Sequence, residues 1–198
     1  IFNFTFFINF NKRIIKRLKK KMKKEHSIYY FGYGANMSIN YLKSRRKVLP
    51  NESISSKLND FKLIMNMEGP NFIEPSFANI KREEGSLVEG VLHKISQNEL
   101  NQIISSEGEN YELIDLLVKA KSKQIKAKTL IYKTDKLIST PPSKRYMKIL
   151  IKAAIESRLS SDYIQKLKKH PYVYFPVLSE IFSIFIFYWV WSRSRLKT

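Results

Sequence analysis

Alternating and clustered apolar positions between residues 27 and 170 predict a run of strands followed by helices. The segment SIYYFGYG (27–34) is rich in aromatic residues and ends in a glycine turn, which is typical of a first strand that leads into a loop. The further predicted strands are LNDFKLIM, SFANIKR, SLVEGVLHKI, YELIDLLVKA and QIKAKTLIYKT. We expect a hairpin at Glu83-Glu84-Gly85, and a second polar turn around Ser122.

Three helices follow from capping signals in the same region. In SQNELNQIISSEG (96–108), Ser96 and Glu99 form a capping box, and Gly108 supplies the stop. Glu107 is therefore expected at the end of a helix, just before the next strand. A proline pair starts a helix through SKRYMKILIKAAIESRL, and Ser160 caps another through DYIQKLKK. Together these elements predict a compact α+β domain over residues 27–171.

The two ends of the chain differ from this domain. Residues 1–26 are an apolar stretch, IFNFTFFINF, followed by a basic run, and we expect either part of a membrane anchor or a basic leader. Residues 172–198 contain the apolar segment YVYFPVLSEIFSIFIFYWVW (172–191), which is about one bilayer long. A carboxylate near mid-membrane is unfavourable, so Glu180 argues against an anchor. A membrane anchor and a final strand or helix packed on the domain both remain open.

Composition restricts the chemistry that the chain can perform. With no cysteine, disulfides, thiolate nucleophiles and thiolate-bound zinc are excluded. The three histidines are scattered without helical spacing, so we expect no metal. The net charge of +19 is concentrated in part between residues 11 and 25, and no nucleic-acid-binding motif accompanies it. We therefore expect no nucleic-acid partner, and we expect a cytoplasmic domain that is either free or anchored to a membrane.

The candidate chemistry lies in a glycine loop, one carboxylate and two tyrosines. Gly32 and Gly34 form a G-x-G after the first strand, but the third glycine of a dinucleotide-binding loop is missing. No nucleophile elbow or Walker loop is present in the sequence. Taken alone, Glu107 would be an ordinary solvated helix end, and the tyrosines would be core or rim residues. Their order along the chain changes this interpretation.

In order and spacing these segments resemble the γ-glutamylcyclotransferase family. YFGYGANM (30–37) is similar to the family loop Y-F-x-Y-G-S-N-[LM], with Ala35 in the place of serine. DFKLIMN and EGVLHKI resemble two family strands, SSEGENY resembles the segment that carries the catalytic glutamate, and TPPSKRYMKI resembles the start of a later helix. The resemblance implies a small mixed β-barrel of about six strands with packed helices. It also implies an enzyme without cofactor or metal.

The resemblance assigns roles to particular residues. It implies Glu107 as the catalytic acid and base, and a small γ-glutamyl compound as the substrate. The substrate-binding residues that it implies are Tyr30, Gly32, Tyr33, Gly34, Ala35, Asn36, Tyr111 and Tyr146. The reaction is a lyase-type cyclisation, in which a γ-glutamyl amino acid or dipeptide forms 5-oxoproline and releases an amine. The loop is closer to this branch than to the γ-glutamylamine or glutathione-specific branches.

Physical chemistry gives these residues plausible tasks. The substrate α-amine attacks its own γ-carbonyl, so correct positioning contributes much of the rate, but an ammonium cannot attack without a base. We expect burial to make Glu107 a better proton acceptor. We also expect Gly32 and Gly34 to permit positive φ and a close approach of the backbone, so that the amides around Tyr33, Ala35 and Asn36 form an anion-binding nest.

Three further expectations complete the interpretation. His93 is a packing or surface residue rather than a ligand, and Glu109 and Glu112 are solvated charges. The alternative function is a non-catalytic, membrane-anchored interaction module of the same fold, in which Glu107 would be exposed. The sequence does not identify the leaving amine or the oligomeric state.

Overall fold

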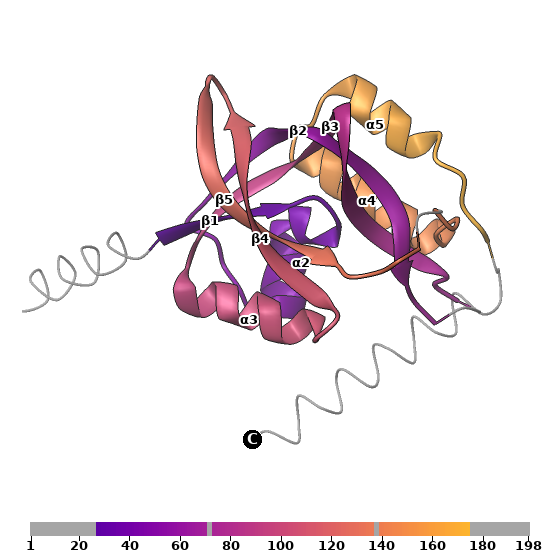
Figure 1. Cartoon of the computed structure of the whole chain (residues 1–198), viewed down its shortest axis with the longest axis horizontal. Coiled ribbons are helices and arrows are strands. Elements are labelled where there is room, and N and C mark those ends of the chain that lie inside the picture. Colours follow the sequence, from indigo (N-terminus) through magenta and orange to yellow (C-terminus); the bar gives the residue numbers. More distant parts are fainter. Residues whose placement is uncertain (1–26, 71–72, 137–138, 175–198) are drawn as a thin grey trace, which may run out of the picture.

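The computed structural model describes residues 27–70, 73–136 and 139–174 (Figure 1). The predictions for residues 1–26, and for the apolar C-terminal segment beyond residue 174, lie outside the described residues. Among the residues that are described, no helix has the length and apolar character needed to cross a membrane.

The described residues form a closed barrel of five strands, with helices packed against it (Figure 1). The strands are β1 (Ser27–Gly32), β2 (Glu52–Glu68), β3 (Ser76–Ser96), β4 (Tyr111–Ala120) and β5 (Lys123–Tyr132). Around the barrel they follow the order β1-β3-β2-β4-β5, and a parallel contact between Tyr30 and Lys128 closes the circle. The other pairings are antiparallel. The predicted α+β mixed barrel is therefore confirmed, with five strands instead of about six.

The missing strand results from a wrong hairpin prediction at Glu83-Glu84-Gly85. This segment lies inside β3, which runs without interruption along β2. The register jumps there from Asn59↔Leu87 to Phe61↔Arg82, so the extra residues form a bulge. Gly85 has a φ of 72°, and its N–H donates to Asp60 Oδ1 at 3.1 Å. The turn signal was real, but pairing with the whole of β2 turned it into a bulge.

Helices occupy both the connection after β1 and the later part of the chain. The connection contains the short segments η1 (Ala35–Met37), α2 (Ile39–Tyr41) and η2 (Leu42–Arg46), which the sequence pattern did not predict. The three predicted helices are confirmed as α3 (Gln97–Glu107), α4 (Lys144–Glu156) and α5 (Ser161–Lys168). Their serine caps are present, including the capping box between Ser96 and Glu99.

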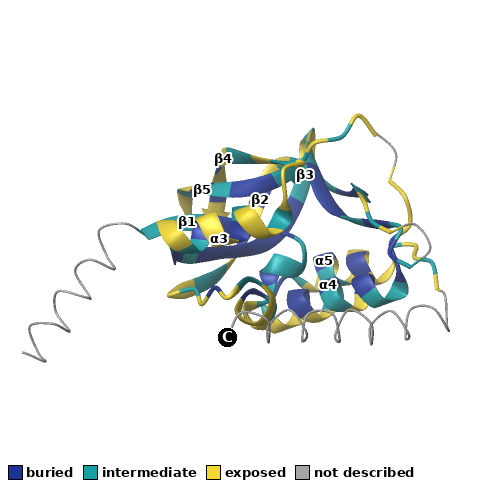
Figure 2. Cartoon of the chain, turned by 90° about the horizontal axis from the view of Figure 1, so that it is seen from below, coloured by how far each residue is buried: buried dark blue, intermediate teal, exposed yellow. Residues whose placement is uncertain are grey.

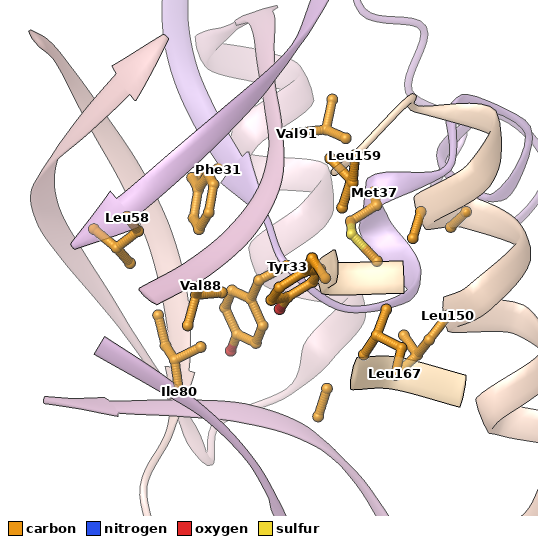
Figure 3. Packing of buried hydrophobic residues seen from close by; sticks show 14 of the residues in the cluster. Phe31, Tyr33, Met37, Leu58, Ile80, Val88, Val91, Leu150, Leu159 and Leu167 are labelled. Atoms are coloured by element: carbon orange, nitrogen blue, oxygen red, sulfur yellow. The ribbon is translucent and has the colours of Figure 1, made fainter. Parts of the chain in front are cut away.

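Two buried clusters hold these elements together. The larger one fills the barrel and continues to the inner faces of α4 and α5, so the buried faces of both helices meet the strands (Figure 2). Figure 3 shows Tyr33 between the barrel residues Phe31 and Val88 and the residues Met37 and Leu150 beyond the barrel. The smaller cluster packs α3 and the β1–η2 connection against the barrel. This packing brings the end of α3 to the connection after β1.

Candidate active site

A cavity of about 310 Å³ lies where the loop after β1, the end of α3, β4 and α4 meet. Eight of the nine residues predicted for the site line it, and the ninth, Gly32, does not. The lining residues are Tyr30, Tyr33, Gly34, Ala35, Asn36, Tyr41, Arg45, Arg46, Met67, Phe77, Ala78, Glu107, Tyr111, Leu130, Arg145, Tyr146 and Ile149. The fold therefore brings together segments that are up to 119 residues apart in the chain, from Tyr30 to Ile149.

The two loop glycines meet one part of our expectation and not the other. Among the described residues, the glycines with positive φ are Gly85 and Gly108, so Gly32 and Gly34 do not use positive φ, but the expected close approach of the backbone is found at Gly32. At Gly32 a Cβ would lie 2.7 Å from the carbonyl oxygen of Asn36, which is closer than real Cβ contacts. Gly32 is thus required because the chain folds back tightly on itself before entering η1.

The backbone of this loop still offers donors beside the cavity. The turn closes with a hydrogen bond from Met37 N–H to the carbonyl of Gly34, at 3.0 Å. The N–H groups of Gly34, Ala35 and Asn36 find no acceptor in the part of the chain that the structure describes. Unpaired N–H groups are normal at the start of a helical turn, and they attract anions. The anion-binding role stays a prediction.

Glu107 is the last residue of α3, and the chain turns away from it at Gly108, which has a φ of 93°. Only 12% of the Glu107 side chain is exposed. Its Oε1 accepts two hydrogen bonds, from Asn36 Nδ2 at 2.9 Å and from Arg46 Nη2 at 2.6 Å. No donor among the described residues reaches its Oε2. One oxygen of this carboxylate is therefore held firmly while the other is free.

The surroundings of Glu107 differ from the purely desolvated pocket that we expected. Arg46 forms an ion pair with the carboxylate at 2.6 Å. Asn36 also contributes, because its Nδ2 donates both to Glu107 and to the Tyr30 hydroxyl at 3.1 Å. With Nδ2 engaged twice, the buried Oδ1 of Asn36 has no hydrogen-bond partner among the described residues.

Tyr30 and Tyr146 each accept a hydrogen bond at the hydroxyl oxygen. Tyr30 accepts from Asn36, and Tyr146 accepts from the backbone N–H of Ala78 at 3.1 Å. Neither hydroxyl has an acceptor for its own proton among the described residues. Burial is the main cause that raises the pKa of both phenols, and the Glu107 carboxylate raises them further. Both groups therefore stay protonated and can act as hydrogen-bond donors.

Tyr33 and Tyr111 are already engaged in contacts of their own. The hydroxyl of Tyr33 donates to the carbonyl of Leu130 at 2.6 Å, which ties the loop to β5. The hydroxyl of Tyr111 lies 2.6 Å from the sulfur of Met67 on β2. Burial raises the pKa of both tyrosines as well. These two residues shape the wall of the cavity, whereas Tyr30 and Tyr146 have hydroxyl protons to offer.

His93 on β3 supports the loop from behind, in agreement with the prediction of a packing role. The ring is fully buried, with Nδ1 lying 2.8 Å from Ser53 Oγ and Nε2 lying 2.9 Å from the carbonyl oxygen of Asn36. Burial lowers the pKa of His93 to about 4, so the ring is neutral. A neutral ring that donates from Nε2 to Asn36 accepts from Ser53. Glu109 and Glu112 are exposed, as expected.

Sequence reasoning missed the arginines of the cavity. Arg45, Arg46 and Arg145 all line it, and Arg145 Nε also binds the buried carboxylate of Glu74 at 2.5 Å. Only nine of the 36 basic residues are arginine, so three of them at one cavity is a notable concentration. The preference for arginine over lysine at these positions was the available signal.

Comparison with known proteins gives a consistent result. The profile of the AIG2-like family matches residues 87–167. The human γ-glutamylcyclotransferase is 32% identical over 155 residues, which cover 73% of this chain and 79% of the human protein. The γ-glutamyl cyclotransferase aclK of Aspergillus oryzae is 22% identical over 172 residues, which cover 75% of this chain but only 63% of that relative. A solved structure of a γ-glutamyl cyclotransferase superposes with a TM-score of 0.66 at 26% identity, covering 74% of this chain and 89% of the other.

Proposed function

The chain belongs to the γ-glutamylcyclotransferase family, and on this premise we propose that it converts a γ-glutamyl amino acid or dipeptide to 5-oxoproline, with Glu107 as the general base. The observation that carries the proposal is the free oxygen of Glu107 at the wall of a cavity of about 310 Å³. In the alternative of a non-catalytic module Glu107 would be exposed, and a side chain that is 88% covered argues against this. We also propose residues 27–171 as the catalytic domain.

The substrate amine needs acceptors, and two lie at the site. Glu107 Oε2 and the buried Asn36 Oδ1 both lack a donor among the described residues. An α-ammonium group has three N–H donors, so two of them can satisfy both atoms. Glu107 then takes one proton from this ammonium, which leaves a nucleophilic amine beside its own γ-carbonyl.

The reaction itself needs no other reactant. The amine nitrogen forms a bond to the γ-carbon, and the carbon–nitrogen bond to the leaving group breaks. Glu107 returns its proton to the departing nitrogen, and the ring nitrogen then loses its second proton through Glu107 to the released amine. The products are 5-oxoproline and the protonated amine. The hydroxyls of Tyr30 and Tyr146 are suited to stabilise the negative charge on the carbonyl oxygen, because both stay protonated. The unpaired amides of η1 are suited to the α-carboxylate.

The arginines favour one class of leaving group. Arg46 is paired with Glu107, and Arg145 is paired with Glu74, but Arg45 has no carboxylate partner among the described residues. An amino acid or dipeptide leaving group carries a carboxylate that can meet this charge, whereas a simple amine cannot. We therefore expect the chain to prefer γ-glutamyl-alanine over γ-glutamyl-ethylamide.

The test is an assay of 5-oxoproline release from γ-glutamyl-alanine by the full chain. We expect turnover by the parent and a loss of at least about a hundredfold in Glu107→Gln, since that is the usual contribution of a general base. Glu109→Gln is the matched control, because Glu109 is a nearby exposed carboxylate, and its rate should stay close to the parental one. Equal rates in the parent and in Glu107→Gln would disprove the proposed mechanism.

A further inference from the structure

Arg46 makes more contacts at the site than any role in substrate binding requires. Its Nη2 donates to Glu107 Oε1 at 2.6 Å, and its Nη1 donates to the carbonyl of Ser106 at 3.0 Å. One guanidinium therefore holds both the carboxylate and the backbone one residue earlier. Ser106 lies in the last turn of α3, where carbonyl groups have no partner within the helix. Arg46 thus caps the C-terminus of α3 and also binds the side chain of its last residue, Glu107.

The guanidinium is itself held in place. Arg46 is the last residue of η2, and Lys47 ends that segment in the left-handed conformation with a φ of 58°. The guanidinium lies 5.6 Å from the centre of the Tyr41 ring, and 14% of the side chain is exposed. Its Nε is buried without a hydrogen-bond partner among the described residues. The position of Arg46 is therefore set by packing as well as by its ion pair.

The distribution of bonds on Glu107 is one-sided. Arg46 and Asn36 both donate to Oε1, and they approach from two different segments, η2 and η1. Two donors on one oxygen restrict rotation of the carboxylate about its terminal bond. They leave Oε2 without a donor. A base that rotates freely would present either oxygen to the substrate, whereas this one presents a single oxygen.

We propose that Arg46 is a positioning residue for the proposed reaction, which fixes Oε1 of Glu107 so that Oε2 is presented to the substrate amine. The inference rests on the proposed function of Glu107 as the base.

A lysine at position 46 should restore only part of the function of Arg46. A lysine ammonium is a point charge at the end of a flexible stem, whereas the guanidinium presents a rigid fork. Lysine can neutralise Glu107, but it cannot reproduce with fixed geometry both the contact to the Glu107 carboxylate at 2.6 Å and the contact to the Ser106 carbonyl at 3.0 Å. A simple charge effect would be restored by lysine, and a positioning effect would be restored only in part.

The kinetic test compares Arg46→Met, Arg46→Lys and Lys43→Met in the full chain with γ-glutamyl-alanine. Lys43 is the matched control, since it is an exposed cation on the same segment that does not line the cavity. We expect kcat of Arg46→Met to fall by at least about tenfold with KM nearly unchanged, because misplacing a reacting group lowers the rate of the bound substrate. Arg46→Lys should recover only part of this loss, and Lys43→Met should match the parent.

Three results would overturn the inference. A parental kcat in Arg46→Met would show that Glu107 does not need Arg46 for its positioning. A raised KM with unchanged kcat would place Arg46 in substrate binding instead. Full recovery in Arg46→Lys would reduce the role to charge alone. Circular dichroism of each variant identifies a loss of fold, and Arg46→Lys keeps the test valid if Arg46→Met does not fold.

A second measurement does not depend on activity. Urea midpoints are compared for the parent, Arg46→Met, Glu107→Gln and the double variant. We expect Arg46→Met to lower the midpoint clearly in the parent and less in Glu107→Gln, because only the parent is left with a covered, unpaired carboxylate. If Arg46→Met lowered the urea midpoint equally in the parent and in Glu107→Gln, Arg46 and Glu107 would not be energetically coupled. If the parent releases no 5-oxoproline, the proposed function fails, while this cycle still decides whether Arg46 holds Glu107.

Discussion

Two carboxylates, the buried Glu89 and the largely covered Glu107, face hollows in the surface and yet differ in what they can do. Glu89 on β3 is 3% exposed, and each of its oxygens has a donor. Oε1 accepts from Ser160 Oγ at 2.7 Å and lies 3.2 Å from Lys57 Nζ, and Oε2 accepts from Ser160 N–H at 2.8 Å. The groove beside Glu89 is the larger hollow, at about 460 Å³. Neither burial nor the size of a hollow therefore identifies a reactive carboxylate.

The difference lies in the hydrogen bonds. Glu89 lies beside the N-terminus of α5, and both of its oxygens accept hydrogen bonds from Ser160. Glu107 is the last residue of α3, and its two donors share one oxygen. The other oxygen of Glu107 remains available to a substrate, whereas both oxygens of Glu89 are engaged.

The largest predicted effect on stability concerns the support behind Glu107. Burial lowers the pKa of His93 to about 4 from an ordinary value of 6.5. The unfolded chain thus takes up a proton on this ring below about pH 6.5, and the folded chain does not until about pH 4. The stability that a neutral His93 contributes is complete above pH 6.5 and is lost as the pH falls to 4, by about 3 kcal/mol.

Urea unfolding of the parent and of His93→Gln over this pH range measures the effect, because other groups cancel in the difference. The NMR signals of the His93 ring give a direct check, since they should not titrate between pH 7 and 5. A His93 ring that titrates near pH 6.5 would contradict the claim that it holds the Asn36 carbonyl in a dry environment.

In the next pair of variants, the carboxylates of Glu89 and Glu107 are each replaced by an amide. Glu89→Gln should destabilise the chain by about 2 kcal/mol, because the new NH₂ group faces donors from Ser160 and Lys57. Glu107→Gln should change stability less, since one oxygen there already lacks a donor and the carbonyl of glutamine still accepts from Asn36. The free energies of unfolding from urea titrations decide this. If Glu107→Gln is the more destabilising variant, the proposed difference between the two carboxylates is wrong.

These residues also show what the sequence could predict. The capping signals at Ser96 and Ser160 and the proline pair before α4 are all local, so they predicted α3, α4 and α5 correctly, although the cap of α4 is Ser143. The hairpin prediction at Glu83-Glu84-Gly85 failed because the pairing of β2 with β3 is a property of the whole sheet. Turn chemistry alone does not separate a hairpin from a bulge.

The residues of the candidate site also include some that the sequence could predict and some that it could not. The resemblance to a family indicated eight residues that do line the cavity, which no local pattern could have assembled from segments so far apart. It did not indicate Arg46, whose partner lies 61 residues away in the sequence. Nor could it predict which oxygen of Glu107 stays free, because that depends on donors from two segments that meet only in the folded chain.

The smallest predicted effect compares the two helix caps beside these carboxylates. Ser160→Ala removes the cap of α5, where the side chain accepts from Tyr163 N–H, and should destabilise the chain by about 1 kcal/mol or slightly more. It also removes the Ser160 Oγ donor to Glu89 Oε1, whereas Ser96→Ala removes a cap at the far end of α3 from Glu107. We therefore expect Ser96→Ala to be the milder change in urea unfolding, and 5-oxoproline release to persist in both variants. Loss of activity in Ser96→Ala without loss of fold would mean that Glu107 is positioned by its helix rather than by Arg46 and Asn36.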